Sequence, residues 1–266
     1  MTTPRVLLTG LAMGESVRWH DGHLWFCDWI AGEIVRLDGS EPVVVSRMSG
    51  LPFCIDWTPA GELLVLDGPG ARLLRDGSVF AGLREIDGSH PWNDIAADAR
   101  GFAFVNNIGY DFPGGAEKPG LIAVVTPDGS ARQVADGLLF PNGMAVTSDG
   151  STLIVAESHG ARLTAFDIAA DGGLSNRRIW ASLPGGAPDG ICLDAEGAIW
   201  YADVPNRHCV RVREGGEVLA RVPLDRGGFD CAIAEDQRTL YAVTADFSDP
   251  QAMFTGHTGQ LVAIDL

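Results

Sequence analysis

One short phrase recurs six times along this chain, and it restricts the chain to a repeat architecture. Each copy begins with a polar or special residue, continues into an apolar run, passes a turn and ends in a second apolar run. The copies are GESVRWHDGHLWFCD, PFCIDWTPAGELLVLD, WNDIAADARGFAFVN, PNGMAVTSDGSTLIVAE, PDGICLDAEGAIWYAD and FDCAIAEDQRTLYAVTA. A period of about 40–50 residues is typical of propellers and other repeat arrays.

The internal pattern of the repeat indicates β-strands. Each copy holds short runs rich in Val, Ile, Leu, Trp and Phe, such as Leu63–Leu66 and Phe102–Val105. Turn signals such as Arg100-Gly101 and Asp149-Gly150 divide these runs, and a third apolar run follows each copy. No stretch shows a sustained helical period. We therefore predict an all-β chain that forms one domain over residues 1–266, a six-bladed β-propeller with four strands in each blade.

The two ends of the chain complement each other. Only Leu266 follows the last apolar run, Gln260–Asp265, so the sixth blade lacks its outer strand. A spare apolar run, Arg5–Thr9, precedes the first repeat. We predict that this N-terminal strand pairs with the last blade and removes an open strand edge.

The first position of each phrase carries the functional signal. These lead positions are Glu15, Phe53, Asn93, Asn142, Asp189 and Asp230. In a propeller the first strand of each blade lies nearest the axis, so positions about 40 residues apart become neighbours at the channel mouth. We expect Glu15, Asn142 and Asp189 to converge there, with Asn93 and Asp230 beside them.

Five of the six lead residues carry a side-chain oxygen, which is the ligand atom that hard cations prefer. We predict one bound divalent cation, with Ca²⁺ favoured and Mg²⁺, Mn²⁺ or Zn²⁺ as alternatives. The competing interpretation is that Asn142 and Asp189, in Pro-Asn-Gly and Pro-Asp-Gly contexts, only satisfy turn backbone. The recurrence of an oxygen at one register in five blades favours the metal.

Composition excludes several classes of function. A net charge of −16 disfavours nucleic acid and anionic membranes as partners. No apolar run approaches the ~20 residues of a membrane span, and Met1–Thr9 lacks the features of a signal peptide. Five scattered cysteines without a CxxC motif are typical of a cytoplasmic chain with reduced thiols. We expect a cytoplasmic protein that acts on a small molecule; the sequence leaves its oligomeric state open.

Several phrases together resemble one known family. They are PNGMAVTSDGSTLIVAES, PDGICLDAEGAIWYAD, the GES near the start and the WND before the third unit. The chain is similar over essentially its whole length to the senescence marker protein/gluconolactonase/luciferin-regenerating-enzyme family. This resemblance implies a six-bladed propeller that binds one divalent cation in its channel and hydrolyses lactones. It also implies that Glu15, Asn142 and Asp189 ligate the metal, and that Asn93 contacts the substrate and the metal, directly or through water.

One departure from the family pattern bears on the substrate. Sugar-lactonase members carry an arginine two residues before that asparagine, where it contacts substrate hydroxyls, and here the position is Pro91. Trp92, Phe53 and Tyr110 would instead form a more apolar, aromatic mouth. We therefore expect a substrate less polar than a sugar lactone.

Further candidates surround these positions. His90 adjoins the Asn93 motif, and Asp230 either lines the pocket or orients a ligand. Two Pro- and Gly-rich departures from the repeat, Gly109–Gly120 and Asp246–His257, are predicted lids or binding loops, with a mobile surface excursion as the alternative. There is no GxSxG elbow, no HExxH motif and no dinucleotide-binding fingerprint.

The predicted function is a metal-dependent hydrolase that opens a lactone or related cyclic ester. Asp189 is the predicted general base, because its carboxylate can touch both metal and water. Glu15 and Asn142 would hold the ion, and Asn93 would position water or substrate. Two alternatives stay open: a propeller enzyme with isomerase, cyclase or phosphoester-hydrolase chemistry, and a non-catalytic binding propeller. The register of oxygen ligands speaks against the second alternative.

Overall fold

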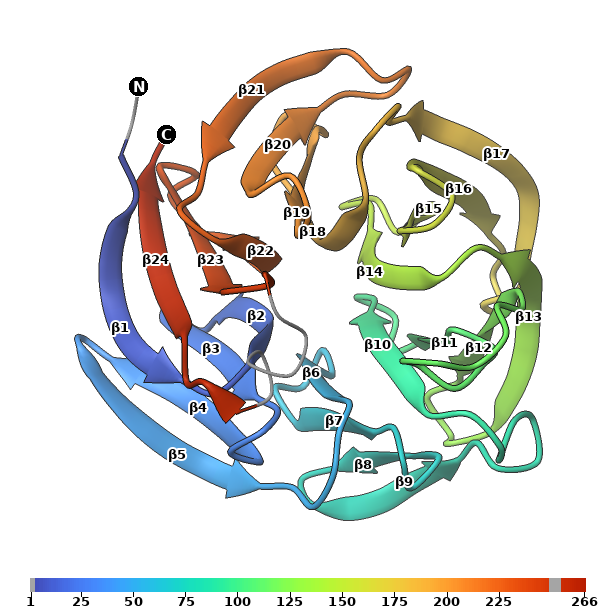
Figure 1. The fold of residues 1–266 in the computed structure, drawn as a ribbon. Helices are drawn as coiled ribbons and strands as arrows, with labels where there is room; N and C mark the ends of the chain where they lie inside the picture. The colour runs from blue at the N-terminus through green and yellow to red at the C-terminus, as the bar shows by residue number, and fades with distance from the viewer. Residues whose placement is uncertain (1–2, 249–254) are drawn as a thin grey trace. The chain divides into compact units, whose positions relative to one another are not determined.

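The computed structural model describes residues 3–248 and 255–266. The regular elements of these residues are 24 β-strands, which form six four-stranded sheets of antiparallel neighbours. This is the fold class of a six-bladed β-propeller, as the repeat predicts (Figure 1). Residues 249–254 of the predicted loop Asp246–His257 lie outside the described residues.

The chain divides into two compact units, each with three of the six sheets. The first unit comprises Met1–Leu51 and Gly185–Leu266, and the second comprises Pro52–Pro184. The prediction that residues 1–266 form one domain stays a prediction.

The first unit contains the first, fifth and sixth blades. Their strands are β2 (Gly14–His20), β3 (His23–Asp28), β4 (Glu33–Asp38) and β5 (Glu41–Arg47) in the first blade; β18 (Pro188–Leu193), β19 (Ile199–Asp203), β20 (His208–Val212) and β21 (Val218–Pro223) in the fifth; and β22 (Gly227–Ile233), β23 (Thr239–Ala245), β24 (Gly259–Asp265) and β1 (Arg5–Leu11) in the sixth.

The second unit contains the second, third and fourth blades. Their strands are β6 (Phe53–Trp57), β7 (Leu63–Asp67), β8 (Arg72–Arg75) and β9 (Ser78–Gly82) in the second blade; β10 (Trp92–Ala97), β11 (Ala103–Asn107), β12 (Gly120–Val125) and β13 (Ala131–Leu138) in the third; and β14 (Pro141–Val146), β15 (Thr152–Glu157), β16 (Arg162–Ile168) and β17 (Leu174–Ser182) in the fourth.

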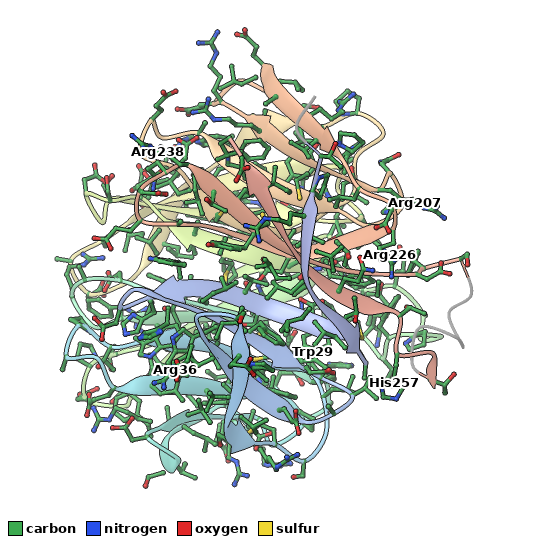
Figure 2. All side chains as sticks on the ribbon, turned by 90° about the vertical axis from the view of Figure 1, so that its left-hand side faces the viewer. Trp29, Arg36, Arg207, Arg226, Arg238 and His257 are labelled. Atoms are coloured by element: carbon green, nitrogen blue, oxygen red, sulfur yellow. The ribbon has the colours of Figure 1, made fainter. Side chains whose placement is uncertain are left out.

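Strand β1 completes the sixth blade. It runs antiparallel to β24, with Arg5 opposite Ala263 and Leu11 opposite Gly259, and Figure 1 shows the blue β1 alongside the red β24. The predicted pairing of the N-terminal run with the last blade is therefore confirmed. Arg226 (Figure 2) supports the same blade, because its Nη1 donates to the carbonyl of Thr258 (2.5 Å), directly before β24.

Apolar side chains of neighbouring blades share hydrophobic clusters. In the first unit, Phe26 of the first blade packs in one cluster with Phe229 and Val243 of the sixth. In the second unit, Phe104 of the third blade packs with Leu153 of the fourth. Burial on both faces of a sheet explains why the second strands read as near-continuous apolar runs instead of alternating ones.

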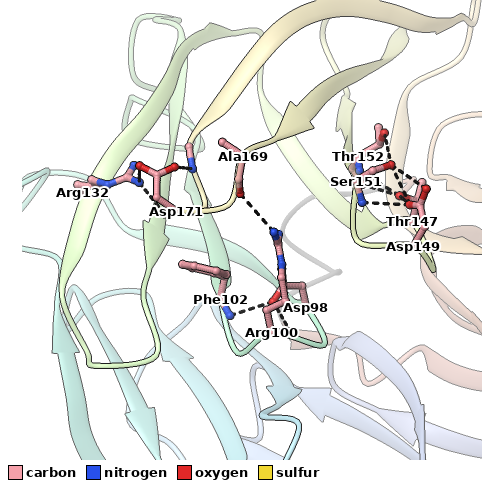
Figure 3. A network of polar contacts seen from close by, with 11 residues as sticks. Asp98, Arg100, Phe102, Arg132, Thr147, Asp149, Ser151, Thr152, Ala169 and Asp171 are labelled. Carbon is pink, nitrogen blue, oxygen red and sulfur yellow. Dashed lines mark hydrogen bonds and ion pairs between the residues drawn. The ribbon is translucent and has the colours of Figure 1, made fainter.

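Aspartate side chains fix the predicted turns between first and second strands (Figure 3). Asp98 Oδ1 accepts from the N–H groups of Arg100 and Phe102 (2.9 and 3.0 Å). Asp149 Oδ1 accepts from Thr147 Oγ1 and the Ser151 N–H (2.7 and 3.0 Å), and these bonds lower the pKa of Asp149 to about 2. Each turn closes on a glycine with positive φ, Gly101 (88°) or Gly150 (70°), as the sequence predicts.

Candidate functional site

The strands that carry the lead residues lie next to one another within each unit. In the first unit β2 and β18 both contact β22, so the strands of Glu15, Asp189 and Asp230 are neighbours. In the second unit β6 and β14 both contact β10, so the strands of Phe53, Asn93 and Asn142 are neighbours. Within each unit, the repeat therefore brings together the strands of residues that lie far apart in the sequence.

A β-bulge accompanies every oxygen-bearing lead residue. The register shifts fall between Glu15 and Arg18, Trp92 and Asp94, Pro141 and Met144, Pro188 and Ile191, and Gly228 and Asp230. The pair β6–β7, which begins at Phe53, stays in register throughout. Bulges re-aim side chains and are common beside active sites. The five oxygen-bearing positions thus differ from Phe53 in backbone geometry as well as in residue type.

A buried acid anchors the loop that precedes Glu15. Asp28, at the end of β3, is 5% exposed. Its two carboxylate oxygens accept from the N–H groups of Ala12 (2.8 Å) and Met13 (2.9 Å). These residues come directly before β2, so the acid fixes the start of the strand that carries Glu15, which is itself 8% exposed.

The same arrangement precedes Asn142 and Asp189. Glu157 ends β15, and its Oε2 accepts from the N–H of Leu139 (2.7 Å), three residues before Asn142. Asp203 ends β19, and its Oδ2 accepts from the N–H of Ala187 (3.4 Å), two residues before Asp189. Both acids have 0% exposure. Each of the three predicted metal ligands therefore follows a loop that is anchored by a buried acid of its own blade.

Glu157 is ionised in spite of its burial. Burial raises the pKa of this carboxyl, but hydrogen bonds from Arg162, Thr164 and the Leu139 N–H outweigh it and leave the pKa below its usual value. Arg162 donates to both oxygens (2.9 and 2.8 Å). A buried charge is tolerated only with such partners.

Asp230 ties the inner strands of the first unit together. It is 2% exposed, and its Oδ2 accepts from the Val17 N–H (2.6 Å) and Arg18 Nη1 (3.1 Å) on β2. A Cβ on Gly190, the residue after Asp189, would lie 1.8 Å from its Oδ1. Asp230 therefore packs between the strands of two predicted ligands, which suits a residue that orients them. Its predicted contact with substrate stays a prediction.

Asn93 and Asn142 are joined in the second unit. Asn93 Nδ2 donates to Asn142 Oδ1 (3.3 Å), and Asn142 Nδ2 donates to Ser158 Oγ (3.4 Å). The carbonyl of Asn142 accepts from Nδ2 of the fully buried Asn106 (2.8 Å). These bonds fix the amide of Asn142, so its oxygen faces the same side as Asn93.

His90 belongs to a closed network before β10. Its Nδ1 lies 2.8 Å from Asp87 Oδ2, and Asp87 Oδ1 accepts from the N–H groups of Ser89 and His90. Asn107 Nδ2, at the end of β11, donates to Asp87 Oδ2 (3.2 Å). Burial raises the pKa of Asp87, but the hydrogen bonds from His90 and these N–H groups outweigh it and lower the pKa. The result is an oriented imidazole three residues before Asn93.

The three predicted aromatic contacts are all buried. Phe53 and Trp92 have 0% exposure, and Trp92 Nε1 donates to the carbonyl of Asp87 (3.1 Å). Tyr110 is 4% exposed. The rings of Phe53 and Trp92 thus offer no exposed surface to a bound molecule in this structure. The substrate contacts predicted for all three residues stay predictions.

Sequence analysis missed the residues that support the candidate ligands. They are Asp28, Asp87, Glu157, Ser158 and Asp203. A signal for three of them was present, because the second strands of these blades end in WFCD, VAE and YAD. Asp87 and Ser158 lie in loops, where only the folded chain shows which side chain they meet.

The donor set suits a hard divalent cation. Glu15 and Asp189 supply carboxylates, Asn142 supplies an amide oxygen, and such oxygens match Ca²⁺ or Mg²⁺. Among the described residues, no cluster of three or more His, Cys, Asp or Glu side chains has the arrangement of a metal site. The predicted set is of a different kind, because an amide oxygen is one of its three ligands.

Fold and sequence together define a β-propeller protein with oxygen-bearing side chains near the starts of five of its inner strands. A family model described as SMP-30/Gluconolactonase/LRE-like region matches residues 13–246. The chain therefore belongs to this family of lactonase-like hydrolases. In the described part of the chain, no helix has the length and apolar character needed to span a membrane.

Two relatives and one solved structure illustrate the family. The chain is 30% identical to pentonolactonase XacC of Haloferax volcanii, over 92% of this chain and 86% of that protein. It is 30% identical to the diisopropyl-fluorophosphatase of Loligo vulgaris, over 72% of this chain and 70% of that protein. A calcium-binding protein, regucalcin, from Agrobacterium tumefaciens has the same fold, with a TM-score of 0.80, 22% identity and coverage of 99% and 93%.

Proposed function

We propose that this protein is a divalent-metal-dependent hydrolase that opens a lactone or related cyclic ester less polar than a sugar lactone. The observation that carries the proposal is the common setting of Glu15, Asn142 and Asp189. Each begins an inner strand at a β-bulge, and each follows a loop anchored by a buried acid. Family membership and the pentonolactonase relative support it.

We assign one divalent cation to Glu15, Asn142 and Asp189, with Ca²⁺ favoured. Regucalcin, which is named as calcium-binding, supports that choice, and Mg²⁺, Mn²⁺ and Zn²⁺ are the alternatives. A cation held there would polarise the ester carbonyl and lower the pKa of a bound water.

The other roles in the proposed reaction are assigned to individual side chains. Asp189 takes the proton from the attacking water as general base. Asn93, hydrogen-bonded to Asn142, orients water or substrate through its amide. His90, oriented by Asp87, contacts the substrate beside Asn93. Asp230 holds β2, which carries Glu15, and lies against Gly190 beside Asp189.

The residue at position 91 supports a substrate of low polarity. Pro91 has no side-chain donor, so it cannot bind a substrate hydroxyl. A site that hydrogen-bonds a hydroxyl discriminates by up to ~10⁴-fold against analogues that lack it, and this position cannot supply that discrimination.

A substrate panel tests the proposal. Chelator-treated protein is supplied with Ca²⁺, and hydrolysis of a gluconolactone-type compound is compared with that of alkyl- and aryl-substituted lactones by base uptake at constant pH. We expect the higher kcat/KM on the less polar lactones. Preference for the polyhydroxylated lactone would contradict the substrate assignment, and no hydrolysis of any lactone would contradict the function.

A second candidate is hydrolysis at phosphorus, of a phosphoester or of a P–F bond. The similarity to diisopropyl-fluorophosphatase favours it, and a cation can polarise a phosphoryl oxygen as it does a carbonyl. Release of fluoride from diisopropyl fluorophosphate, measured beside the lactone panel, separates the two.

A further inference from the structure

An aromatic cluster lies beside Asn142 in the second unit. The loop between β11 and β12 contributes Tyr110 and Phe112, and the turn before β14 contributes Phe140. The ring centroids of Phe112 and Phe140 are 5.1 Å apart at an interplanar angle of 86°, and those of Tyr110 and Phe140 are 6.0 Å apart at 71°. These are edge-to-face contacts, the arrangement that aromatic pairs prefer.

The cluster is joined to the candidate site through Ser158. The Ser158 N–H donates to the carbonyl of Phe140 (3.0 Å), and its Oγ accepts from Asn142 Nδ2 (3.4 Å). Phe140 also precedes Asn142 by only two residues. The backbone of Phe140, from which the ring projects, is therefore tied through Ser158 to a predicted metal ligand.

Part of the cluster faces solvent. Phe112 is 55% exposed and Leu139, next to Phe140, is 42% exposed. The ring of His159 lies 4.5 Å from that of Phe140, and its Nδ1 is 3.3 Å from Glu117 Oε1 in the same loop. The loop thus contacts the fourth-blade segment at two points, through Phe112 with Phe140 and through Glu117 with His159. The ring of Phe112 nevertheless stays largely exposed.

The buried hydroxyl of Tyr110 is a second, independent indication that a ligand binds at this cluster. Tyr110 is 4% exposed, and its hydroxyl has no hydrogen-bond partner within residues 3–248 and 255–266. Burial of a hydroxyl without a partner is unfavourable, and most buried polar atoms are hydrogen-bonded. If the ring served only to pack the loop, phenylalanine would pack equally well without that cost.

We propose that Tyr110, Phe112 and Phe140 form a subsite for an aryl group attached to the lactone ring. This proposal rests on the proposed function for the identity of the reacting ring. The aryl group packs against Phe112 and Phe140, and the Tyr110 hydroxyl donates to an oxygen of the bound molecule. The subsite thereby selects aryl-substituted substrates over unsubstituted ones.

Binding of an ether that cannot be hydrolysed tests the subsite separately from catalysis. The Kd of 2-phenyltetrahydrofuran and of tetrahydrofuran is measured by NMR titration of the Ca²⁺-supplied full chain. We expect the phenyl compound to bind at least about tenfold more tightly, since filling an apolar pocket discriminates on this scale. Phe112→Ala should abolish the preference. The matched control is Phe80→Ala, a partly buried ring on β9 of the same unit, and it should retain the preference.

Tyr110→Phe separates the contribution of the hydroxyl to ligand binding from the contribution of the ring to packing. It should weaken binding of the phenyl ether by a few-fold, on the scale of one neutral hydrogen bond, without lowering Tm. Equal affinity for the two ethers, or a preference that survives Phe112→Ala, would overturn the proposal. Absence of lactone hydrolysis with the binding preference intact would overturn the proposed function but not the subsite.

Discussion

At the scale of single residues, buried carboxylates are the most constrained side chains, because each needs hydrogen-bond partners. Asp28, Glu157 and Asp203 are each at most 5% exposed, and each accepts a backbone N–H from the loop before a predicted ligand. A buried charge without partners is very costly. Their hydrogen bonds therefore serve both stability and the placement of the strand that carries the predicted ligand.

Asp189→Asn should lower turnover about 10²–10⁴-fold, the scale of one positioned acid–base group. The amide retains an oxygen for the metal but cannot accept a proton from water. Single-turnover rates on the best lactone, with metal content measured on the same sample, check this. Asp149→Asn, a change of the same type in an exposed turn, is the control. A metal-loaded Asp189→Asn protein with the wild-type rate would remove Asp189 from the role of base.

Glu157 should make stability depend on pH in acid. Its pKa is lower in the folded chain than the reference value of 4.5, so its contribution is complete above that value and is lost as pH falls through the folded-state pKa. The free energy of unfolding of wild type should therefore exceed that of Glu157→Gln at pH 7, and the gap should shrink by pH 3. Urea unfolding across this range measures the gap. A gap that is constant with pH would contradict the assignment.

At the scale of elements, the acid at the end of a second strand positions the start of the first strand of its own blade. Asp203→Asn should therefore weaken divalent-cation binding about 10–100-fold, as loss of supporting hydrogen bonds around metal ligands does. Calorimetric titration with Ca²⁺ measures this.

The second blade offers a matched control for that experiment. Asp67 ends β7, is 5% exposed and pairs with Arg72, but the first strand of its blade begins with Phe53, which is not a ligand. Asp67→Asn should lower Tm and leave the Ca²⁺ affinity unchanged. Equal losses of affinity in both variants would show that general destabilisation, not ligand placement, is the cause.

The sequence predicts the strands and turns well because the same pattern occurs six times, and each copy indicates the same local structure. The blade order, the turns at Gly101 and Gly150 and the pairing of β1 with β24 all follow from period and residue type. The bulges at the lead positions and the Asp87–His90 pair do not, because they depend on which backbone and side-chain atoms meet after folding. The burial of Trp92 does not follow from the sequence either, because its ring nitrogen donates to the carbonyl of Asp87 in the loop before β10.

At the scale of the whole molecule, β1 joins the two ends of the chain in one blade. Deletion of residues 1–9 should expose the edge of β24 and lower Tm, by about 2–4 °C for each kcal/mol lost in a chain of this size. Differential scanning calorimetry measures the shift. Removal of residues 2–4 alone, which precede β1, is the control and should leave Tm nearly unchanged. An unchanged Tm after the longer deletion would show that β1 contributes no stability.

The central claim is that Glu15, Asn142 and Asp189 hold one divalent cation. Equilibrium dialysis of chelator-treated protein against Ca²⁺ tests it most directly, because it counts ions without reference to any substrate. We predict one Ca²⁺ per chain at saturation, since the chain carries one predicted set of three oxygen ligands. Failure to bind Ca²⁺, Mg²⁺, Mn²⁺ or Zn²⁺ in a fixed ratio to the chain would contradict it.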